Sequence, residues 1–471
     1  MGTAALLTAA LPTFVTLALA LSQHGLIGDI GFDIANGRWI LAHGFVPLAN
    51  HLSFAMSGAH WSNSEWLFGV YVAWLYGVGG HIAVYLGLLP LLLGLALLLA
   101  GAARRTGPYW QVILPLVAAV TIMPVMSPRP QLVSFVLFAY LFSALEAARH
   151  GRVQGLWAAA LSTLVWVQVH GSVVLVPGLI ALNLLLPSGE LTRRRLAGPL
   201  VLSLLLLLVR PGGPLAVLRN LLDVGSGGNT SVISEWASPN FHLPWAMLAA
   251  LVLFVSLPLV VPELARRRRF ADLVLLLGSA FALLYAQRFL PYFIIAALCI
   301  AAPLLPRRWR VAQPGEVPAA ARRSLAIGLA TGVALAVLLV SRPVFPLRSP
   351  MQAIGYLRRQ HATDVFAAYQ IGASLELYGV EPYLDSRDNL WLQRSWWPQF
   401  VAVTQGAMSV TSYLRRYDPG AEYVLWQVRS PVALELDQSP QWRRVLVDKN
   451  PLGPSPGTYG GYAVWRKAGA S

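Results

Sequence analysis

Residues 28–67 read GDIGFDIANGRWILAHGFVPLANHLSFAMSGAHWSNSEWL, a long polar segment in a chain that is otherwise mostly apolar. An apolar run precedes this segment, and many more follow it. Of the 471 residues, 56% are hydrophobic and only 12% are charged, and the mean hydropathy is +0.59. This composition is not that of a soluble globular protein. We therefore interpret the chain as a polytopic membrane protein, with residues 23–64 as its first outer loop.

The apolar runs predict eleven membrane-spanning helices, although several are shorter than the roughly 20 residues that a span usually needs. Residues 65–80 are apolar and aromatic as well. Trp and Tyr are typical of the membrane–water interface, so we expect this segment to form a helix that lies there without spanning. The predicted spans lie near residues 4–22, 82–101, 112–126, 131–147, 155–169, 172–186, 196–209, 244–262, 271–286, 289–305 and 324–341.

The basic residues form short clusters between the apolar runs. If the N-terminus is cytoplasmic and residues 65–80 do not span, every cluster falls on the cytoplasmic side, as the positive-inside rule requires. This pattern accounts for the net charge of +15 without nucleic acid, and we expect no nucleic-acid partner. The clusters are Arg104 and Arg105, Arg193 to Arg195, Arg266 to Arg269, and Arg307, Arg308, Arg310, Arg322 and Arg323.

The last part of the chain, residues 342–471, changes in character. It has more charges and prolines, and helical patterns such as residues 351–360 and 410–416 alternate with short β-rich runs. Such alternation predicts a small α/β layer. We expect an extracytoplasmic α/β domain of about 130 residues after an all-α membrane domain over residues 1–341. The β-rich runs are DVFAAY, EPYLD, AEYVLW, RRVLVD and YAVWRK.

Two carboxylates in the first outer loop are candidate catalytic groups. Asp29 and Asp33 are four residues apart, which places them on one face of a helix. They can act as a general base and as a ligand of substrate or metal; alternatively, Asp29 caps the following helix and Asp33 is solvated. Because both adjoin the end of a span, where an unpaired charge is costly, we favour a catalytic role. Glu65 closes the same loop and is a candidate substrate ligand.

The signals for a metal ion are weak. The loop also holds His24, His43, His51 and His60, but no pair has the HExxH-like spacing of a helical zinc site. The single cysteine, Cys299, can form neither an intramolecular disulfide nor a Cys-based zinc site. The sequence leaves a divalent metal cofactor open.

Three basic residues mark the outer edges of later spans. Arg129, in MSPRPQL, and Arg288, in AQRFLPYF, can each bind a phosphate through two hydrogen bonds. Either arginine alone is explained equally well by contact with lipid headgroups, and only their joint placement favours a phosphate site. His170, beside Gly171, interrupts an apolar stretch and either orients a substrate or marks an interfacial turn.

Two further segments carry candidate binding residues. The outer loop 210–243 contains GSGGNTSVISEWASPNF, in which Glu235 and Trp236 are candidates for acceptor binding or for a lid. In the terminal domain, EPYLDSRDNLW places Asp385 and Arg387 just after an expected strand, a common position for binding residues in α/β folds. A structural Asp–Arg pair is the alternative.

The identity and order of these residues along the chain resemble the sequence pattern of bacterial GT-C-type membrane glycosyltransferase-like proteins. Asn50-His51-Leu52 stands where that pattern has Asp-Pro before Ser-Phe, and Asp33 stands where it often has His, which leaves metal use open. The matching positions are Asp29, Gly37, Trp39, Ile40, Leu41, Gly44, Pro47, Ser53, Phe54, Gly58, Trp61, Glu65 to Leu67, Arg129 to Gln131, Trp166, His170, Gly171, Glu235, Trp236, Arg288, Phe293, Asp385 and Arg387.

The resemblance implies an enzyme of the bacterial inner membrane that takes a sugar from a polyprenyl-phosphate carrier at the outer face. The acceptor is extracytoplasmic: a glycan, a lipid or a protein. The acidic residue of the family's first loop corresponds to Asp29.

On this hypothesis Asp29 or Asp33 deprotonates an acceptor hydroxyl, which attacks the anomeric carbon and inverts it. Arg129 and Arg288 hold the charge of the departing polyprenyl phosphate. Two alternatives remain. A transporter or flippase would carry charges or broken helices at mid-bilayer depth in repeated halves, and a non-catalytic protein of envelope assembly would use the terminal domain for binding. No Walker loop and no GxSxG elbow occurs in the required context, which disfavours ATP-driven transport and serine hydrolysis.

Overall fold

The computed structural model divides the chain into two compact units. The first, the bundle unit, comprises Met1–Gln23, Tyr85–Val217 and Ile233–Val344, and the second, the mixed unit, comprises His24–Val84, Leu218–Val232 and Phe345–Ser471. The first outer loop therefore belongs to the same unit as the C-terminal segment. The structure describes residues 3–23, 29–188, 191–213, 216–217, 234–305, 349–391, 394–449 and 461–469.

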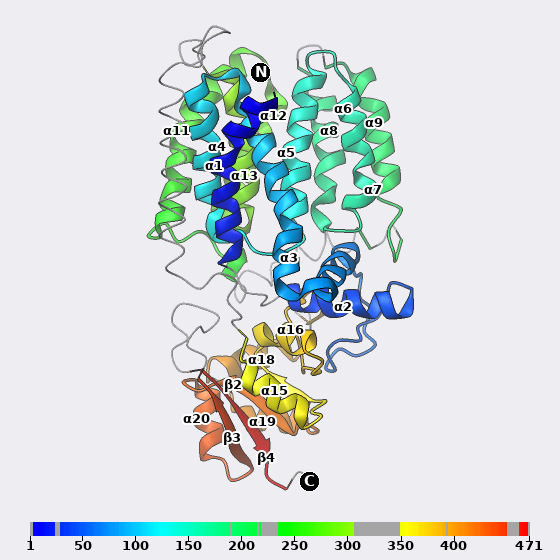
Figure 1. The fold of residues 1–471 in the computed structure, drawn as a ribbon, viewed down its shortest axis with the longest axis vertical. Coiled ribbons are helices and arrows are strands. Elements are labelled where there is room, and N and C mark those ends of the chain that lie inside the picture. Colours follow the sequence, from blue (N-terminus) through cyan, green and yellow to red (C-terminus); the bar gives the residue numbers. More distant parts are fainter. Residues whose placement is uncertain are drawn as a thin grey trace. The chain divides into compact units, whose positions relative to one another are not determined.

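The bundle unit is built from apolar helices that run antiparallel to one another (Figure 1). Within the described residues, helices occupy the first ten predicted spans, whereas the eleventh, 324–341, lies outside them. In the part of the chain that the structure describes, five helices are long and apolar enough to cross a membrane, and other apolar helices are shorter. The helices are α1 (Thr3–Ser22), α3 (Trp66–Ala102), α4 (Pro108–Ile122), α5 (Gln131–Ala148), α6 (Gln154–Leu161), α7 (Thr163–Trp166), α8 (Leu175–Leu185), α9 (Arg193–Leu206), α11 (Pro244–Arg266), α12 (Phe270–Tyr285) and α13 (Leu290–Ala301).

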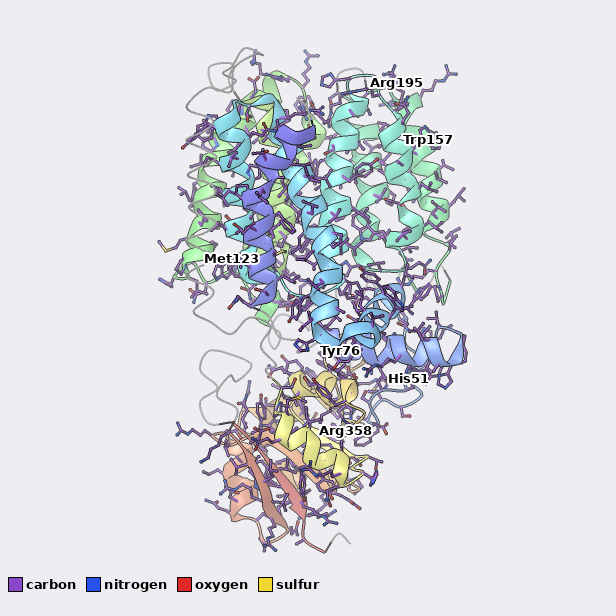
Figure 2. The ribbon with its side chains drawn as sticks, viewed as in Figure 1. His51, Tyr76, Met123, Trp157, Arg195 and Arg358 are labelled. Atoms are coloured by element: carbon purple, nitrogen blue, oxygen red, sulfur yellow. The ribbon has the colours of Figure 1, made fainter. Side chains whose placement is uncertain are left out.

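Arginines gather at one end of this bundle. Because successive helices alternate in direction, the C-terminal ends of α5 and α11 and the N-terminal ends of α9 and α12 lie together, and Figure 2 shows Trp157 and Arg195 at that end and Met123 away from it. The end is held by a buried network: Arg149 donates to Asp272 and to Asn183, each at 2.9 Å. Arginines that the sequence analysis used only for topology therefore also join helices: Arg269, directly before α12, pairs with Glu146 of α5 at 3.1 Å.

A glycine pair breaks α3 into two helices. Gly79 and Gly80 depart from helical geometry, and Gly80 (φ 62°, ψ −151°) adopts a conformation that is essentially restricted to glycine. At 1.5 Å per residue the helix over residues 66–78 is about 20 Å long, shorter than the roughly 30 Å of a hydrocarbon core. A helix separate from the following span is what the sequence predicts for residues 65–80, and its location at the interface stays a prediction.

The mixed unit contains α2 (Asp29–His43), the first part of α3 and a small α/β layer. Its sheet has the order β1-β2-β4-β3, with β1 and β2 parallel and the other neighbours antiparallel. Helices α15 and α20 pack against this sheet (Figure 1). The elements are α15 (Met351–Arg359), β1 (Val365–Ala367), α16 (Tyr369–Leu377), α17 (Asp388–Trp391), α18 (Trp397–Thr404), α19 (Val410–Tyr417), β2 (Tyr423–Gln427), α20 (Pro431–Gln438), β3 (Trp442–Asp448) and β4 (Tyr462–Lys467).

Four of the five β-rich runs form strands, and the fifth prediction is wrong. The run EPYLD makes only an isolated bridge, between Pro382 and Val365. Proline has no N–H and fixes φ, so it cannot continue a ladder of backbone hydrogen bonds. Asp385 therefore follows an irregular segment and not the expected strand.

Two glycines of α2 allow its close packing inside the mixed unit. A Cβ atom on Gly31 would lie 2.2 Å from the carbonyl oxygen of Ala373 in α16, and one on Gly37 would lie 2.0 Å from that of Gly69 in α3. Arg38, directly after Gly37, donates to the carbonyl of Leu377 at 3.0 Å. The backbone of α2 thus touches two neighbouring helices, which fixes the helix that carries Asp29.

Candidate functional site

Four of the predicted substrate-binding residues meet in the bundle unit. A guanidinium nitrogen of Arg129 donates to the carboxylate of Glu235. The guanidinium of Arg288 lies 4.1 Å from the centre of the Trp236 ring, the distance of a cation–π contact. Because Glu235 and Trp236 are consecutive, one short segment joins both arginines. We call Arg129, Glu235, Trp236 and Arg288 the arginine cluster.

Local backbone structure explains how these residues meet. Arg129 stands in the turn just before α5, and Arg288 lies in a short 3-10 helix, Gln287–Phe289, just before α13. The segment Ser234–Trp236 is a similar 3-10 turn, and the N–H of Gln287 donates to the carbonyl of Ala237 at 2.9 Å. Trp236 is buried, whereas the side chains of Arg129 and Glu235 keep 27% and 38% of their exposure. The buried indole of Trp236 therefore anchors the cluster, and the charged side chains of Arg129 and Glu235 stay partly exposed.

The charges of the arginine cluster do not cancel. Burial opposes ionisation of Glu235, but the charges of Arg129 and Arg288 and the hydrogen bond from Arg129 outweigh it, so the pKa of Glu235 lies below its usual value. Two guanidinium cations face one carboxylate, which leaves one net positive charge. Such a cluster can bind an anion through geometrically matched hydrogen bonds.

His170 lies beside a group of hydroxyls in the same unit. Its Nδ1 is 2.7 Å from Ser172 Oγ and 3.1 Å from Ser134 Oγ, and Trp166 Nε1 donates to Ser134 Oγ at 2.9 Å. The backbone N–H of Ser172, which can only donate, also points to Nδ1. The ring is therefore the tautomer that is protonated on Nε2. Burial and the charge of Arg288 lower the pKa of His170 to about 3, so the imidazole is neutral and adds no charge to its surroundings.

Asp385 and Arg387 form a buried ion pair in the mixed unit. Arg387 Nε donates to Asp385 Oδ1 at 2.9 Å, and Arg387 Nη2 donates to Asn50 Oδ1 at 2.6 Å. The guanidinium also lies 4.4 Å from the Trp61 ring centre. Both partners of the pair are almost fully buried. The pair therefore ties the C-terminal segment to the first outer loop, as the structural alternative of the sequence analysis describes.

A second acid, Glu376, lies beside this buried pair. Its Oε1 is 3.7 Å from Arg387 Nη2. Burial and the neighbouring charge of Asp385 raise the pKa of Glu376 well above its usual value, whereas Arg387 and hydrogen bonds hold the pKa of Asp385 below it despite burial. The surroundings thus favour the protonated form of Glu376 and the ionised form of Asp385. The charge of Asp33 also acts on Arg387.

The two candidate catalytic carboxylates lie on α2, four residues apart as expected, but their exposure differs. Asp29 is the first residue of the helix and is half-buried. Asp33 is 1% exposed. Glu65, directly before α3, is half-buried. Asp29 and Glu65 are thus accessible to a substrate, whereas Asp33 faces the interior of the mixed unit.

The described residues offer no obvious metal site. Among them, no group of three or more His, Cys, Asp or Glu side chains is arranged to hold an ion.

Comparison with known proteins gives structural neighbours. No family model and no curated protein sequence matches the chain. The oligosaccharyltransferase AglB of Archaeoglobus fulgidus, in complex with an inhibitory peptide and a dolichol-phosphate, superposes with a TM-score of 0.59 at 12% identity, over 90% of this chain and 69% of that one. ArnT of Cupriavidus metallidurans, in the apo state, gives a TM-score of 0.52 at 14% identity, over 96% and 95% of the two chains. The fold is that of the GT-C glycosyltransferases.

On this GT-C fold the predicted residues form two groups. Arg129, Glu235, Trp236, Arg288 and His170 belong to the bundle unit, and the rest belong to the mixed unit. Residues 214–215 and 218–233 of the outer loop 210–243 lie outside the described residues, and a function of this loop as a lid stays a prediction. The residues of the mixed unit are Asp29, Asp33, Glu65, Asp385 and Arg387.

Several polar residues of the two units went unrecognised in the sequence. Ser134 and Ser172 lie in apolar runs, where a single serine is an ordinary helix residue. Glu376 lies within a helical stretch of the terminal domain, where an acid is usually solvated. Asn50 could have been noticed, because it stands at a departure from the GT-C pattern, but its partner Arg387 is more than 300 positions away.

Proposed function

We propose that the chain is a membrane glycosyltransferase that moves a sugar from a polyprenyl-phosphate carrier to an extracytoplasmic acceptor. The observation that carries this proposal is the arginine cluster on a GT-C fold. Two arginines from separate turns converge on one segment and keep a net positive charge. The complex of the structural neighbour AglB with dolichol-phosphate, which is itself a polyprenol phosphate, supports the choice of donor.

In the proposed reaction the arginine cluster binds the phosphate of the donor. When the bond between the anomeric carbon and the phosphate oxygen breaks, the electron pair stays on that oxygen and the phosphate gains negative charge. Arg129 and Arg288 stabilise this charge where it develops. The neutral His170 is proposed as a hydrogen-bonding ligand of the substrate, because its charge-free ring lies close enough to Arg288 to be affected by it.

Asp29 is the proposed general base. It takes the proton of an acceptor hydroxyl, whose oxygen attacks the anomeric carbon from the face opposite the phosphate, so the configuration inverts. We prefer Asp29 to Asp33 because Asp33 is 1% exposed and its charge acts on Arg387. Glu65, half-buried in the same loop, is proposed to bind the acceptor.

We further propose an orientation in the bacterial inner membrane. The arginine-rich end of the bundle faces the cytoplasm, as the positive-inside rule requires. The arginine cluster lies in turns that precede α5 and α13, at the opposite ends of those helices. On this orientation the N-terminus is cytoplasmic, and the donor phosphate and the C-terminal domain are extracytoplasmic.

The first test measures donor consumption. Wild-type protein in lipid nanodiscs is given a panel of polyprenyl-phosphate sugars and a membrane extract as the acceptor source, and mass spectrometry follows each donor. We expect turnover by the wild type and a loss of at least about 100-fold in Asp29→Asn and in Arg288→Gln, since one removes the base and the other a charge-stabilising group. Arg194→Gln, exposed in the first turn of α9, is the control and keeps full activity.

Two results count against this proposal. If every donor stays intact with the wild type, the proposed transferase activity is wrong. Transport of the intact donor between the two leaflets is then measured. If Asp29→Asn turns over normally while Asp33→Asn does not, the base is assigned wrongly.

A further inference from the structure

Glu235 is unexpected in a site for an anion. A phosphate needs cations and hydrogen-bond donors, yet Glu235 offers only acceptors, and it occupies Arg129 with an ion pair. The pKa of its carboxyl is lowered, so the negative charge is present at neutral pH. The side chain is 38% exposed, which leaves its charge close to whatever Arg129 binds.

The consequence of this carboxylate is a low net charge. Arg129 and Arg288 alone would give the arginine cluster a charge of plus two. Glu235 reduces the charge to plus one, and the neutral His170 leaves it there. Glu235 therefore weakens the attraction of the cluster for each negative charge of a ligand, and the reduction is larger for a dianion than for a monoanion.

The phosphates of such a reaction differ in charge. A polyprenyl-phosphate sugar is a phosphodiester with one negative charge. The polyprenyl phosphate left after transfer is a phosphomonoester, whose second pKa is near 6, and it carries about 1.5 to 2 negative charges at pH 7. A sugar on a polyprenyl diphosphate also carries two. A residue that repels the second charge would favour the diester donor and weaken binding of the product.

We propose that Glu235 sets the charge selectivity of the arginine cluster: it weakens binding of phosphomonoester dianions and diphosphates more than binding of a phosphodiester monoanion. This inference rests on the proposed function and specifies its donor class. It also gives the ion pair with Arg129 a role in the release of the product: the dianion that forms during transfer is bound less tightly than the two arginines alone would bind it.

A purely structural role for Glu235 makes a different prediction. If the carboxylate only holds Arg129 in place, its removal weakens binding of every phosphate alike. If it selects by charge, its neutralisation strengthens binding of dianions and leaves monoanions nearly unchanged. Glu235→Gln separates the two roles, because the amide oxygen still accepts from Arg129 while the charge is gone.

The test is equilibrium binding of two lipid probes to full-length protein in nanodiscs. One probe is a short-chain polyprenyl phosphate, and the other is its methyl phosphodiester, which stays a monoanion at all pH values used. At pH 8 we expect the ratio of monoester affinity to diester affinity to be lower in the wild type than in Glu235→Gln. In Glu235→Gln the affinity for the monoester rises about tenfold, and that for the diester changes less than threefold. At pH 5.5, where the monoester is mostly a monoanion, the difference between wild type and variant shrinks.

A matched control uses another glutamate of the bundle unit that pairs with arginines. Glu263 accepts from Arg266 and Arg267 at the arginine-rich end of the bundle, and Glu263→Gln leaves both affinities unchanged. Equal weakening of both probes in Glu235→Gln, or an unchanged preference at pH 8, overturns the proposal. Because binding needs no turnover, these results are independent of whether sugar transfer is observed. Absence of binding of either probe to the wild type overturns the assignment of the cluster as a phosphate site.

Discussion

At the scale of single residues, Arg387 is the charge on which the buried acids of the mixed unit depend. It is 4% exposed, and it contacts Asp385, Asn50 and Glu376. Removing one partner of a buried ion pair typically costs about 3–5 kcal/mol, because the remaining charge stays buried without compensation. We expect Arg387→Ala to lower the free energy of unfolding of the mixed unit by an amount of this order, as measured by hydrogen exchange of the β1 and β2 amides.

The control for this prediction is Arg443→Ala, since Arg443 is exposed on β3 and such substitutions usually change stability by less than about 0.5 kcal/mol. A second variant, Arg387→Lys, keeps the charge but cannot make the forked contacts with Asp385. We expect it to fall between wild type and alanine. Equal protection of the β1 and β2 amides in Arg387→Ala and wild type would show that the pair contributes no net stability.

Some residues of the candidate site can be recognised from the sequence alone. Arg129, His170 and Arg288 are conspicuous because a polar group at the edge of an apolar run requires a reason. A joint role of Arg129 and Arg288 at a phosphate stays a prediction, and in the structure both arginines contact the same short segment. Nothing comparable marks Ser134 or Glu376. Their positions are ordinary for serine and glutamate, and their partners come from other elements, so only the tertiary structure identifies them.

At the scale of elements, the packing of α2 depends on a missing side chain. A Cβ atom on Gly31 would lie 2.2 Å from the backbone oxygen of Ala373, which cannot move without displacing α16. We expect Gly31→Ala to destabilise the mixed unit by about 1–3 kcal/mol, the usual cost of overpacking, and to accelerate hydrogen exchange in α2 and α16. Gly77→Ala, where nothing lies within 4 Å, is the control. Unchanged exchange in Gly31→Ala would mean that the two helices separate without cost.

Helices and strands could be predicted from the sequence where the neighbouring residues alone determine them. Apolar runs located the helices of the bundle, and the aromatic composition of residues 65–80 separated that segment from the following span, because both are local properties of the sequence. The segment EPYLD misled, since its residues favour a strand while Pro382 prevents continued pairing. The grouping of the first loop with the C-terminal segment has no local signal at all, because its contacts join residues more than 300 positions apart.

At the scale of the whole molecule, the proposed function divides between two units. The bundle unit holds the anion-binding charges, and the mixed unit holds Asp29 on a helix that its neighbours contact closely. The buried acids of the mixed unit make its stability sensitive to pH. Conditions for activity measurements must therefore keep this unit folded.

The direction in which stability changes with pH follows from the carboxyl pair Asp364 and Asp418. Burial and the charge of Asp418 raise the pKa of Asp364, and burial raises the pKa of Asp418. The folded chain thus holds a proton that the unfolded chain, with carboxyl pKa values near 4, releases. The stabilisation is fully present below about pH 4 and is lost as the pH rises through the raised values. Other charges near the pair are Glu381, Glu422 and Lys467.

We therefore expect the mixed unit to be less stable at pH 8 than at pH 5, measured as the free energy of opening of the β1 and β2 amides after correction for intrinsic exchange. Asp364→Asn removes the repulsion within the pair, so it should raise stability at pH 8 and flatten the pH dependence. Some dependence remains because the raised pKa of Glu376 acts in the same direction. Asp437→Asn serves as the control, since Asp437 is partly exposed and pairs with Arg444. A steeper fall of stability with pH in Asp364→Asn than in wild type would contradict a proton held between the two carboxyls.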